Sequence, residues 1–191
     1  MKRRRFVMGA AATVLAGSAR AEVVLRDDGL HDQPFFLDSF LELEYDLADA
    51  QAAGKGLIIL VEQRGCPYCK ELHEVNFERP EITDYLTANF DVLQLDLWGS
   101  RGMVGFDGVE REEKSQIASW GVSFTPTQMF YTLEDGAPKE VFRMPGYFKP
   151  FHHMSALEYV ATGAYADQPF QRFLQDKFAA LAEQGIDPEV W

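Results

Sequence analysis

The sequence predicts an α/β protein with a central mixed β-sheet flanked by helices. Strand-like segments alternate with helix-like segments in the first part of the chain, and two further strand-like segments, 127–132 and 140–143, are joined by a turn signal. Alternation with helices favours parallel strands, whereas a tight turn joins antiparallel ones. The chain has 191 residues, of which 47% are hydrophobic, which is enough for one domain with a sizeable core.

Residues 1–21 have the organisation of a signal peptide. A basic start precedes a short apolar stretch, residues 6–17, and small residues flank the expected cleavage site near Ala21. The apolar stretch is short for a bilayer span, which favours cleavage over a retained membrane anchor. Arg3 and Arg4 resemble a twin-arginine signal, so both the twin-arginine and the general export route stay open. We therefore expect an exported, periplasmic protein.

The net charge argues against two classes of partner. The whole chain carries −12, and removal of residues 1–21 leaves 13 basic against 30 acidic side chains, about −17. Such an acidic surface repels phosphates and anionic headgroups. We therefore expect no nucleic acid and no anionic membrane surface as partner.

Residues 22–56 are expected to form an N-terminal extension that ends in a first helix. The segment 22–34 is charged and rich in turn residues, which indicates an extended conformation. Ser39 and Glu42 have the spacing of a capping box, and apolar residues follow at helical intervals to about Ala53.

Residues 57–149 are expected to form the core of the domain, and residues 150–191 a C-terminal helical extension of it. The segment 57–61 is a short run of branched apolar residues bounded by glycines, which suits a buried strand. The other elements expected in the core are helices from Pro67, at 81–89 and at 110–120, a strand at 90–97, and a glycine-rich loop at 98–108.

The chain has two cysteines, Cys66 and Cys69, placed between the strand at 57–61 and the helix from Pro67. They would close a loop too small to stabilise the fold much, so the pair indicates chemistry rather than a structural link. At the start of a helix, free backbone N–H groups and the helix dipole favour a thiolate over a thiol. Cys66 is therefore the expected nucleophile.

The order of these elements resembles the thioredoxin superfamily over residues 57–149. A strand leads to Cys-Pro-Tyr-Cys at the start of a helix, and Thr125-Pro126 stands directly before a later strand. The resemblance implies the thioredoxin fold, thiol:disulfide oxidoreductase activity through a Cys66–Cys69 disulfide, and a cis Pro126 that faces the dithiol. The residues that it places in contact with substrate are Pro67, Tyr68, Thr125 and Pro126.

A closer resemblance is to periplasmic thioredoxin-like proteins of the SoxW type, which accompany sulfur-oxidation systems. It rests on residues 61–73, on the glycine-rich loop, and on residues 146–150 and 157–160. It implies a reductase whose partners are a client protein with a disulfide or modified cysteine and a membrane thiol-electron donor of the CcdA/SoxV type. Service in cytochrome c maturation is an alternative within the same chemistry.

The chain also departs from the usual thioredoxin pattern. Gly65 stands where thioredoxins place tryptophan, and Pro-Tyr replaces Gly-Pro between the cysteines. The buried acid of thioredoxins would fall at Leu60. Glu62 lies two residues further along and so on the same strand face, which makes it a candidate proton acceptor for Cys69; the alternative is a partly solvated carboxylate near the strand end.

Two rival functions remain beside the redox one. Cys66, Cys69 and His73 offer three soft ligands, but a structural zinc site requires four, and Lys70 stands where a haem-attachment motif requires histidine. We therefore expect no metal and no cofactor. A redox-inert binding or chaperone module with the same fold is the alternative of a different class. Client identity, redox potential, direction and oligomeric state are not predicted.

Overall fold

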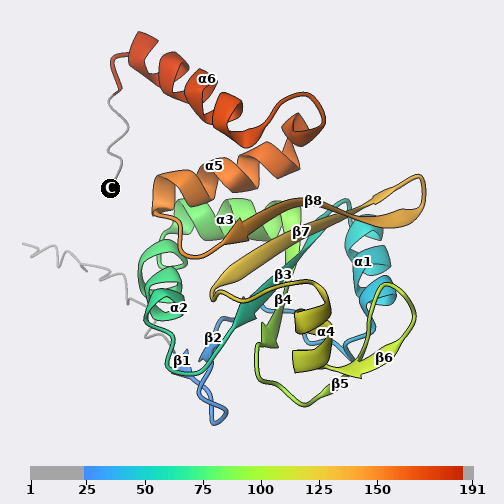
Figure 1. The fold of residues 1–191 in the computed structure, drawn as a ribbon. Helices are drawn as coiled ribbons and strands as arrows, with labels where there is room; N and C mark the ends of the chain where they lie inside the picture. The colour runs from blue at the N-terminus through green and yellow to red at the C-terminus, as the bar shows by residue number, and fades with distance from the viewer. Residues whose placement is uncertain (1–23, 187–191) are drawn as a thin grey trace, which may run out of the picture.

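A computed structural model describes residues 24–186, so the predicted signal peptide lies outside the described residues (Figure 1). The main sheet has four strands, in the spatial order β4 (Phe90–Asp96), β3 (Gly56–Glu62), β7 (Thr127–Glu134) and β8 (Ala137–Pro145). Strand β3 runs parallel to β4 and antiparallel to β7, and β7 runs antiparallel to β8. The predicted mixed sheet is confirmed.

Helices cover both faces of this sheet (Figure 1). On one face lie α1 (Leu43–Ala52) and α4 (Glu113–Ser119), and on the other lie α3 (Pro80–Asn89) and α5 (Pro150–Ala161). Each pair of helices contributes apolar side chains to its own core. The sheet therefore separates two hydrophobic cores.

Strand β3 supplies both cores because its side chains alternate between the faces. Leu57 and Ile59 pack in the core with α1, whereas Ile58 and Leu60 pack in the core with α3 and α5. Leu60 is fully buried, so the position that holds an acid in thioredoxins is part of the apolar core here. Glu62 shares its face, two residues nearer the end of the strand.

The helix that follows β3 is short and changes its geometry. Helix α2 (Pro67–Glu71) continues directly into a π-helical turn, η1 (Leu72–Asn76), and the N–H of Phe77 donates to the carbonyl of Leu72 five residues back. π-Helical turns occur frequently at functional sites. Of the three buried residues of η1, Leu72 packs in the core with α3 and α5, whereas His73 and Asn76 bind other polar side chains.

The first helix starts later than the sequence pattern indicates, and the predicted capping box is wrong. The hydroxyl of Ser39 accepts from the N–H of Leu41 and donates to Asp46, and Glu42 makes no side-chain cap. Leu41 has a left-handed φ of 61°, which is incompatible with a right-handed helix at this residue, and the helix starts at Leu43.

The segment predicted as a loop and a helix forms a hairpin followed by a shorter helix. Strand β5 (Gly102–Val104) pairs antiparallel with β6 (Glu110–Glu112), and α4 begins only after β6. The buried carboxylate of Glu113 fixes this arrangement: it receives two hydrogen bonds from the Arg101 guanidinium, at 2.6 and 3.0 Å, and others from backbone N–H groups. Through Glu113 this segment is held against Asp96, the last residue of β4.

The two terminal segments pack against the core. Strands β1 (Val24–Leu25) and β2 (His31–Asp32) form a small hairpin. The segment that follows lies along the outer edge of β4, where the N–H of Leu37 donates to the carbonyl of Val92. A 3-10 turn, η2 (Ala164–Ala166), leads to α6 (Phe170–Glu183), whose aromatic rings pack on α5. Within residues 24–186, every helix is too short or too polar to cross a membrane.

Candidate active site: the dithiol at the end of strand β3

Cys66 forms the N-cap of helix α2. Its backbone is extended (φ −78°, ψ 113°), Pro67 occupies the first helical turn, and the N–H of Cys69 donates to the Cys66 sulfur at 3.0 Å. Proline suits this position because its fixed φ fits a helix start and its missing N–H leaves no orphan donor. The sulfur of Cys66 therefore sits at the positive end of the helix, where a thiolate is stabilised.

The two cysteines form a disulfide. Their Cα atoms are 5.2 Å apart, which is within the usual range for a disulfide. Cys66 is 4% exposed and Cys69 is fully buried. A substrate from solution therefore meets the Cys66 sulfur first, which fits the expected order of attack.

The Thr125–Pro126 segment lies directly against this sulfur. The peptide bond between Thr125 and Pro126 is cis, as the resemblance implies. The Thr125 hydroxyl donates to the Cys66 sulfur at 3.3 Å, and the carbonyl oxygen of Thr125 lies 3.6 Å from the same atom. The structure thus brings together two segments that are almost sixty residues apart in the chain. A thiolate at Cys66 would have two donors, one from Cys69 and one from Thr125.

Gly65 explains the missing tryptophan before the first cysteine. Its φ is +72°, a left-handed conformation that side chains rarely adopt, and a Cβ built there would meet nothing within 4 Å. The turn from β3 into α2 therefore favours glycine because of its backbone conformation, since there is space for a side chain.

We expect Gly65→Ala to lower the free energy of unfolding by about 1–2 kcal/mol, because only the backbone conformation is penalised. Urea denaturation of the oxidised protein measures this. Gly102→Ala is the matched control, since Gly102 lies in β5 without a positive φ and its Cβ would have one contact, at 3.4 Å. Equal losses in the two variants would show that the turn does not require a left-handed residue.

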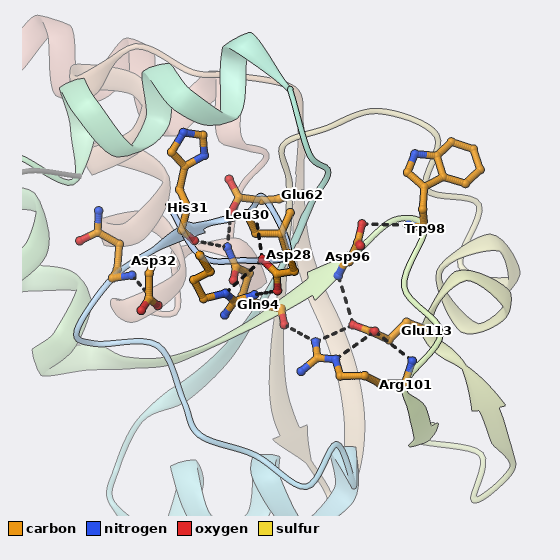
Figure 2. A network of polar contacts seen from close by, with 12 residues as sticks. Asp28, Leu30, His31, Asp32, Glu62, Gln94, Asp96, Trp98, Arg101 and Glu113 are labelled. Carbon is orange, nitrogen blue, oxygen red and sulfur yellow. Dashed lines mark hydrogen bonds and ion pairs between the residues drawn. The ribbon is translucent and has the colours of Figure 1, made fainter. Parts of the chain in front are cut away.

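Glu62, the last residue of β3, is buried in a polar network that includes Gln94 (Figure 2). It is 1% exposed, and its two oxygens lie 3.2 and 3.1 Å from Nε2 of His73, which is fully buried. Nε2 of Gln94 donates to Glu62 at 2.5 Å and to the carbonyl of His31 at 2.8 Å. The hydrogen bonds of Glu62 go to these side chains and not to a cysteine sulfur. The partly solvated alternative for Glu62 is therefore wrong.

The tautomer of His73 follows from its second partner. Nε2 of Gln33 lies 3.1 Å from Nδ1 of His73, and an amide nitrogen can only donate. Nδ1 therefore accepts, and Nε2 carries the proton that is donated to Glu62. Cys69 and His73 are four residues apart on one helical segment, the spacing of neighbours on a helix face. That spacing could have indicated His73 as the partner of the site from sequence alone.

The same contacts bear on the zinc alternative. Both ring nitrogens of His73 are engaged by Glu62 and Gln33, and the two sulfurs are bonded to each other. Within residues 24–186, no group of three or more histidine, cysteine or acidic side chains could hold a metal ion. The ligand set considered from sequence is not assembled in this oxidised structure.

A second polar network lies on the other side of η1. Asn76 contacts Nδ1 of the fully buried His153 at 3.0 Å, and Nε2 of His153 lies 3.1 Å from Oε1 of Gln128. Burial lowers the pKa of His153 to about 4. The Tyr147 hydroxyl donates to Asn76, and the Tyr147 ring stacks on Tyr68 between the cysteines, with centroids 6.4 Å apart. This network therefore supports the surface beside Cys66.

Comparison with known proteins shows which family and which solved structures this chain is similar to. A family model for a Thioredoxin-like domain matches residues 43–161. A thioredoxin from Thermus thermophilus has 25% sequence identity and a TM-score of 0.50, over 62% of this chain and 83% of that one. The C-terminal domain of DsbD from Neisseria meningitidis in its oxidised form has 18% identity and a TM-score of 0.46, over 65% of this chain and 96% of that one. No curated protein matches.

A cysteine pair at the start of a helix, faced by a cis proline on a thioredoxin fold, defines a thiol:disulfide oxidoreductase. The chain belongs to the family of thioredoxin-like domains, since the matched region covers more than half of it.

Proposed function

We propose that this protein is a periplasmic reductase of the SoxW type, which keeps the cysteine of a client protein in a sulfur-oxidation system reduced. The observation that carries the direction is the buried carboxylate of Glu62, on the strand that leads into the dithiol. Negative charge near a cysteine pair disfavours thiolates, so it favours the disulfide form of the enzyme and the passage of electrons to the client. The predicted signal peptide supports the compartment.

The reaction has two exchange steps. The Cys66 thiolate attacks one sulfur of the client disulfide; a mixed disulfide forms, and the other client sulfur leaves as a thiolate that takes up a proton. Cys69 then loses its proton and attacks the Cys66 sulfur, which releases the second client thiol and closes the Cys66–Cys69 disulfide. The client gains two electrons from the enzyme and takes up two protons; Cys69 releases one proton in the second step, and the other comes from solvent, to which Cys66 lost its proton when the thiolate formed. Cys66, Cys69, Thr125 and Pro126 carry these steps, with Pro67 and Tyr68 beside them.

Glu62 is the proposed acceptor for the proton of Cys69. It lies on the face of β3 that is directed toward α2 and η1, and its partner His73 follows Cys69 by one helical turn. A buried base in this place would let the second step proceed at a pH where a buried thiol is protonated.

We expect Glu62→Gln to slow release of the client thiol by about tenfold to a hundredfold near pH 6.5, because the internal base is lost, and by less near pH 9, where hydroxide replaces it. Stopped-flow measurement of the second step across this range gives the profile. Glu71→Gln is the control, since Glu71 is an exposed carboxylate at the end of α2. An unchanged pH profile would remove Glu62 from the mechanism.

A reductase in an oxidising compartment needs an external source of electrons, because each turnover leaves its own cysteines as a disulfide. A membrane thiol-electron donor of the CcdA/SoxV type would meet that need. Attack by a donor thiol would take place at Cys66, the more exposed of the two cysteines.

The experiment is to trap the thiols of living cells with acid, alkylate them, and measure the redox state of the chain. A reductase is expected to be held largely reduced, and oxidised when the membrane donor is deleted. An exported chain that stays oxidised in the presence of the donor would contradict the reductase and favour an oxidase. The Cys69→Ser variant supplies the reference band for one free thiol.

A further inference from the structure

The N-terminal extension contacts the buried network around Glu62, although residues 24–42 precede the region that the family model matches. The carbonyl of His31 accepts from Nε2 of Gln94 at 2.8 Å, and Gln94 donates to Glu62 (Figure 2). Two residues after His31, Nε2 of Gln33 lies 3.1 Å from Nδ1 of His73. The extension therefore binds both side chains that hold the Glu62 carboxylate.

Gln33 is fixed in place by the backbone on either side of it. Leu30 is 2% exposed, and Phe36 forms an isolated parallel β-bridge with Val92 of β4. The N–H of Phe36 donates to the carbonyl of Gln33 at 3.1 Å, which closes a turn between the hairpin and the sheet edge. The amide of Gln33 is thus presented to His73 by an anchored segment.

The other groups around the His73 ring are apolar or neutral. Two phenylalanine rings lie edge-on to it, one from the extension and one directly after η1, with centroids 5.7 and 5.2 Å away. The ring of His31 lies 4.9 Å from it, and burial, together with His73 nearby, lowers the pKa of His31, which favours its neutral form. On the helical segment itself, the exposed side chains of Lys70 and Glu74 pair with each other at 3.5 Å.

These contacts determine where the His73 ring carries its proton. An amide N–H can only donate, so Nδ1 accepts from Gln33 and the ring proton lies on Nε2. A second proton, on Nδ1, would leave two donors facing each other at a buried place, which is unfavourable. The neutral ring donates to Glu62 without placing a positive charge beside the carboxylate.

We propose that Gln33 is a positioning residue for the second exchange step. It holds His73 neutral, with the proton on Nε2, so that Glu62 has no cation beside it. The inference deepens the proposed function and rests on the role of Glu62 in it. In that step the proton leaves the Cys69 sulfur for a Glu62 oxygen while this sulfur attacks Cys66, and His73 keeps the proton that it had.

The direct test is the ¹⁵N NMR spectrum of the His73 ring in the oxidised wild type at about pH 7. Long-range ¹H–¹⁵N correlation distinguishes the two neutral tautomers from each other and from the imidazolium, and the loss of the signals in His73→Gln assigns them. The ring is expected to carry one proton, on Nε2. A proton on Nδ1 would overturn the proposal, and this measurement requires no change at Gln33.

The variant Gln33→Glu places a carboxylate, which can only accept, opposite Nδ1 of His73. It should convert the ring to the imidazolium at about pH 7. It should also slow release of the client thiol by about tenfold to a hundredfold, as expected for loss of the internal base. Gln33→Met removes the donor without adding a charge, so it should slow this step by less.

Gln51→Glu is the matched control, because Gln51 is also a half-buried amide, in α1, and donates to the carbonyl of Lys55. It should leave the spectrum and the rate unchanged. A neutral His73 ring in Gln33→Glu would overturn the proposal. So would an imidazolium with an unchanged second step, and Glu62→Gln measured in parallel shows whether the role of Glu62 fails with it. If the wild type reduced no disulfide, the proposed function would fail, whereas the spectrum would still decide the protonation state.

Discussion

Cys66→Ser is expected to abolish the reduction of a protein disulfide, with a loss of at least about a thousandfold, because a serine hydroxyl cannot replace the thiolate as nucleophile. Cys69→Ser is expected to behave differently. It keeps the nucleophile at the N-cap of α2, so it should attack once and then stop as a stable mixed disulfide. Turnover of a model protein disulfide, with mass spectrometry of the trapped species, measures both outcomes.

The contrast between the two variants separates the redox function from the inert alternative. A binding or chaperone module would hold its partner equally well with serine at either position, and neither variant would trap a covalent complex. If wild type, Cys66→Ser and Cys69→Ser gave the same result, the fold would serve binding alone. If Cys69→Ser lost the first attack as well, the assignment of Cys66 as nucleophile would be wrong.

The second large effect concerns His153 and the stability of the fold in acid. Its pKa is lowered by burial from 6.5 to about 4, so the unfolded chain binds more protons than the folded one between these values. Stability should therefore be complete above about pH 6.5 and fall as the pH drops toward 4, by about 3 kcal/mol from this group. A protonated Nδ1 would face the amide of Asn76, which donates to it in the structure.

Urea denaturation of wild type and His153→Gln at pH 7.0 and pH 4.5 tests this. The acid loss of the variant should be smaller by about 2–3 kcal/mol, since glutamine does not titrate and can still bond Asn76 and Gln128. His152→Gln is the control, because His152, which precedes His153 in the chain, is only partly buried. An identical acid loss in wild type and His153→Gln would show that this histidine does not control acid stability.

The central strand and the cysteine turn could be predicted from sequence because their signals are local. A short run of branched apolar residues predicts β3 to within one residue at each end. The alternation of apolar and polar residues from Phe90 predicts β4. Pro67 after Cys66 fixes the start of α2 in the same way. The cis Pro126 facing the dithiol was predicted from the resemblance and not from a local pattern, and the contact of the Thr125 hydroxyl with the Cys66 sulfur is seen only in the structure.

The remainder could not be predicted because it depends on contacts between distant segments. His73 is hydrogen-bonded to Gln33, which lies on the N-terminal extension. Glu62 is hydrogen-bonded to Gln94, which lies on β4. The charged stretch after Gly108 has helical composition, yet its first residues pair with β5 since the Glu113 carboxylate is bound to Arg101. Tertiary contacts override local propensity in both places.

The equilibrium reduction potential of the Cys66–Cys69 pair tests the central claim most directly. Titration of the wild type against glutathione or dithiothreitol buffers, followed by alkylation, gives the value. A reductase with a buried carboxylate at the end of the strand that leads to its dithiol is expected near about −270 mV, the value of thioredoxin. A potential near about −120 mV, that of the strong oxidant DsbA, would contradict the account.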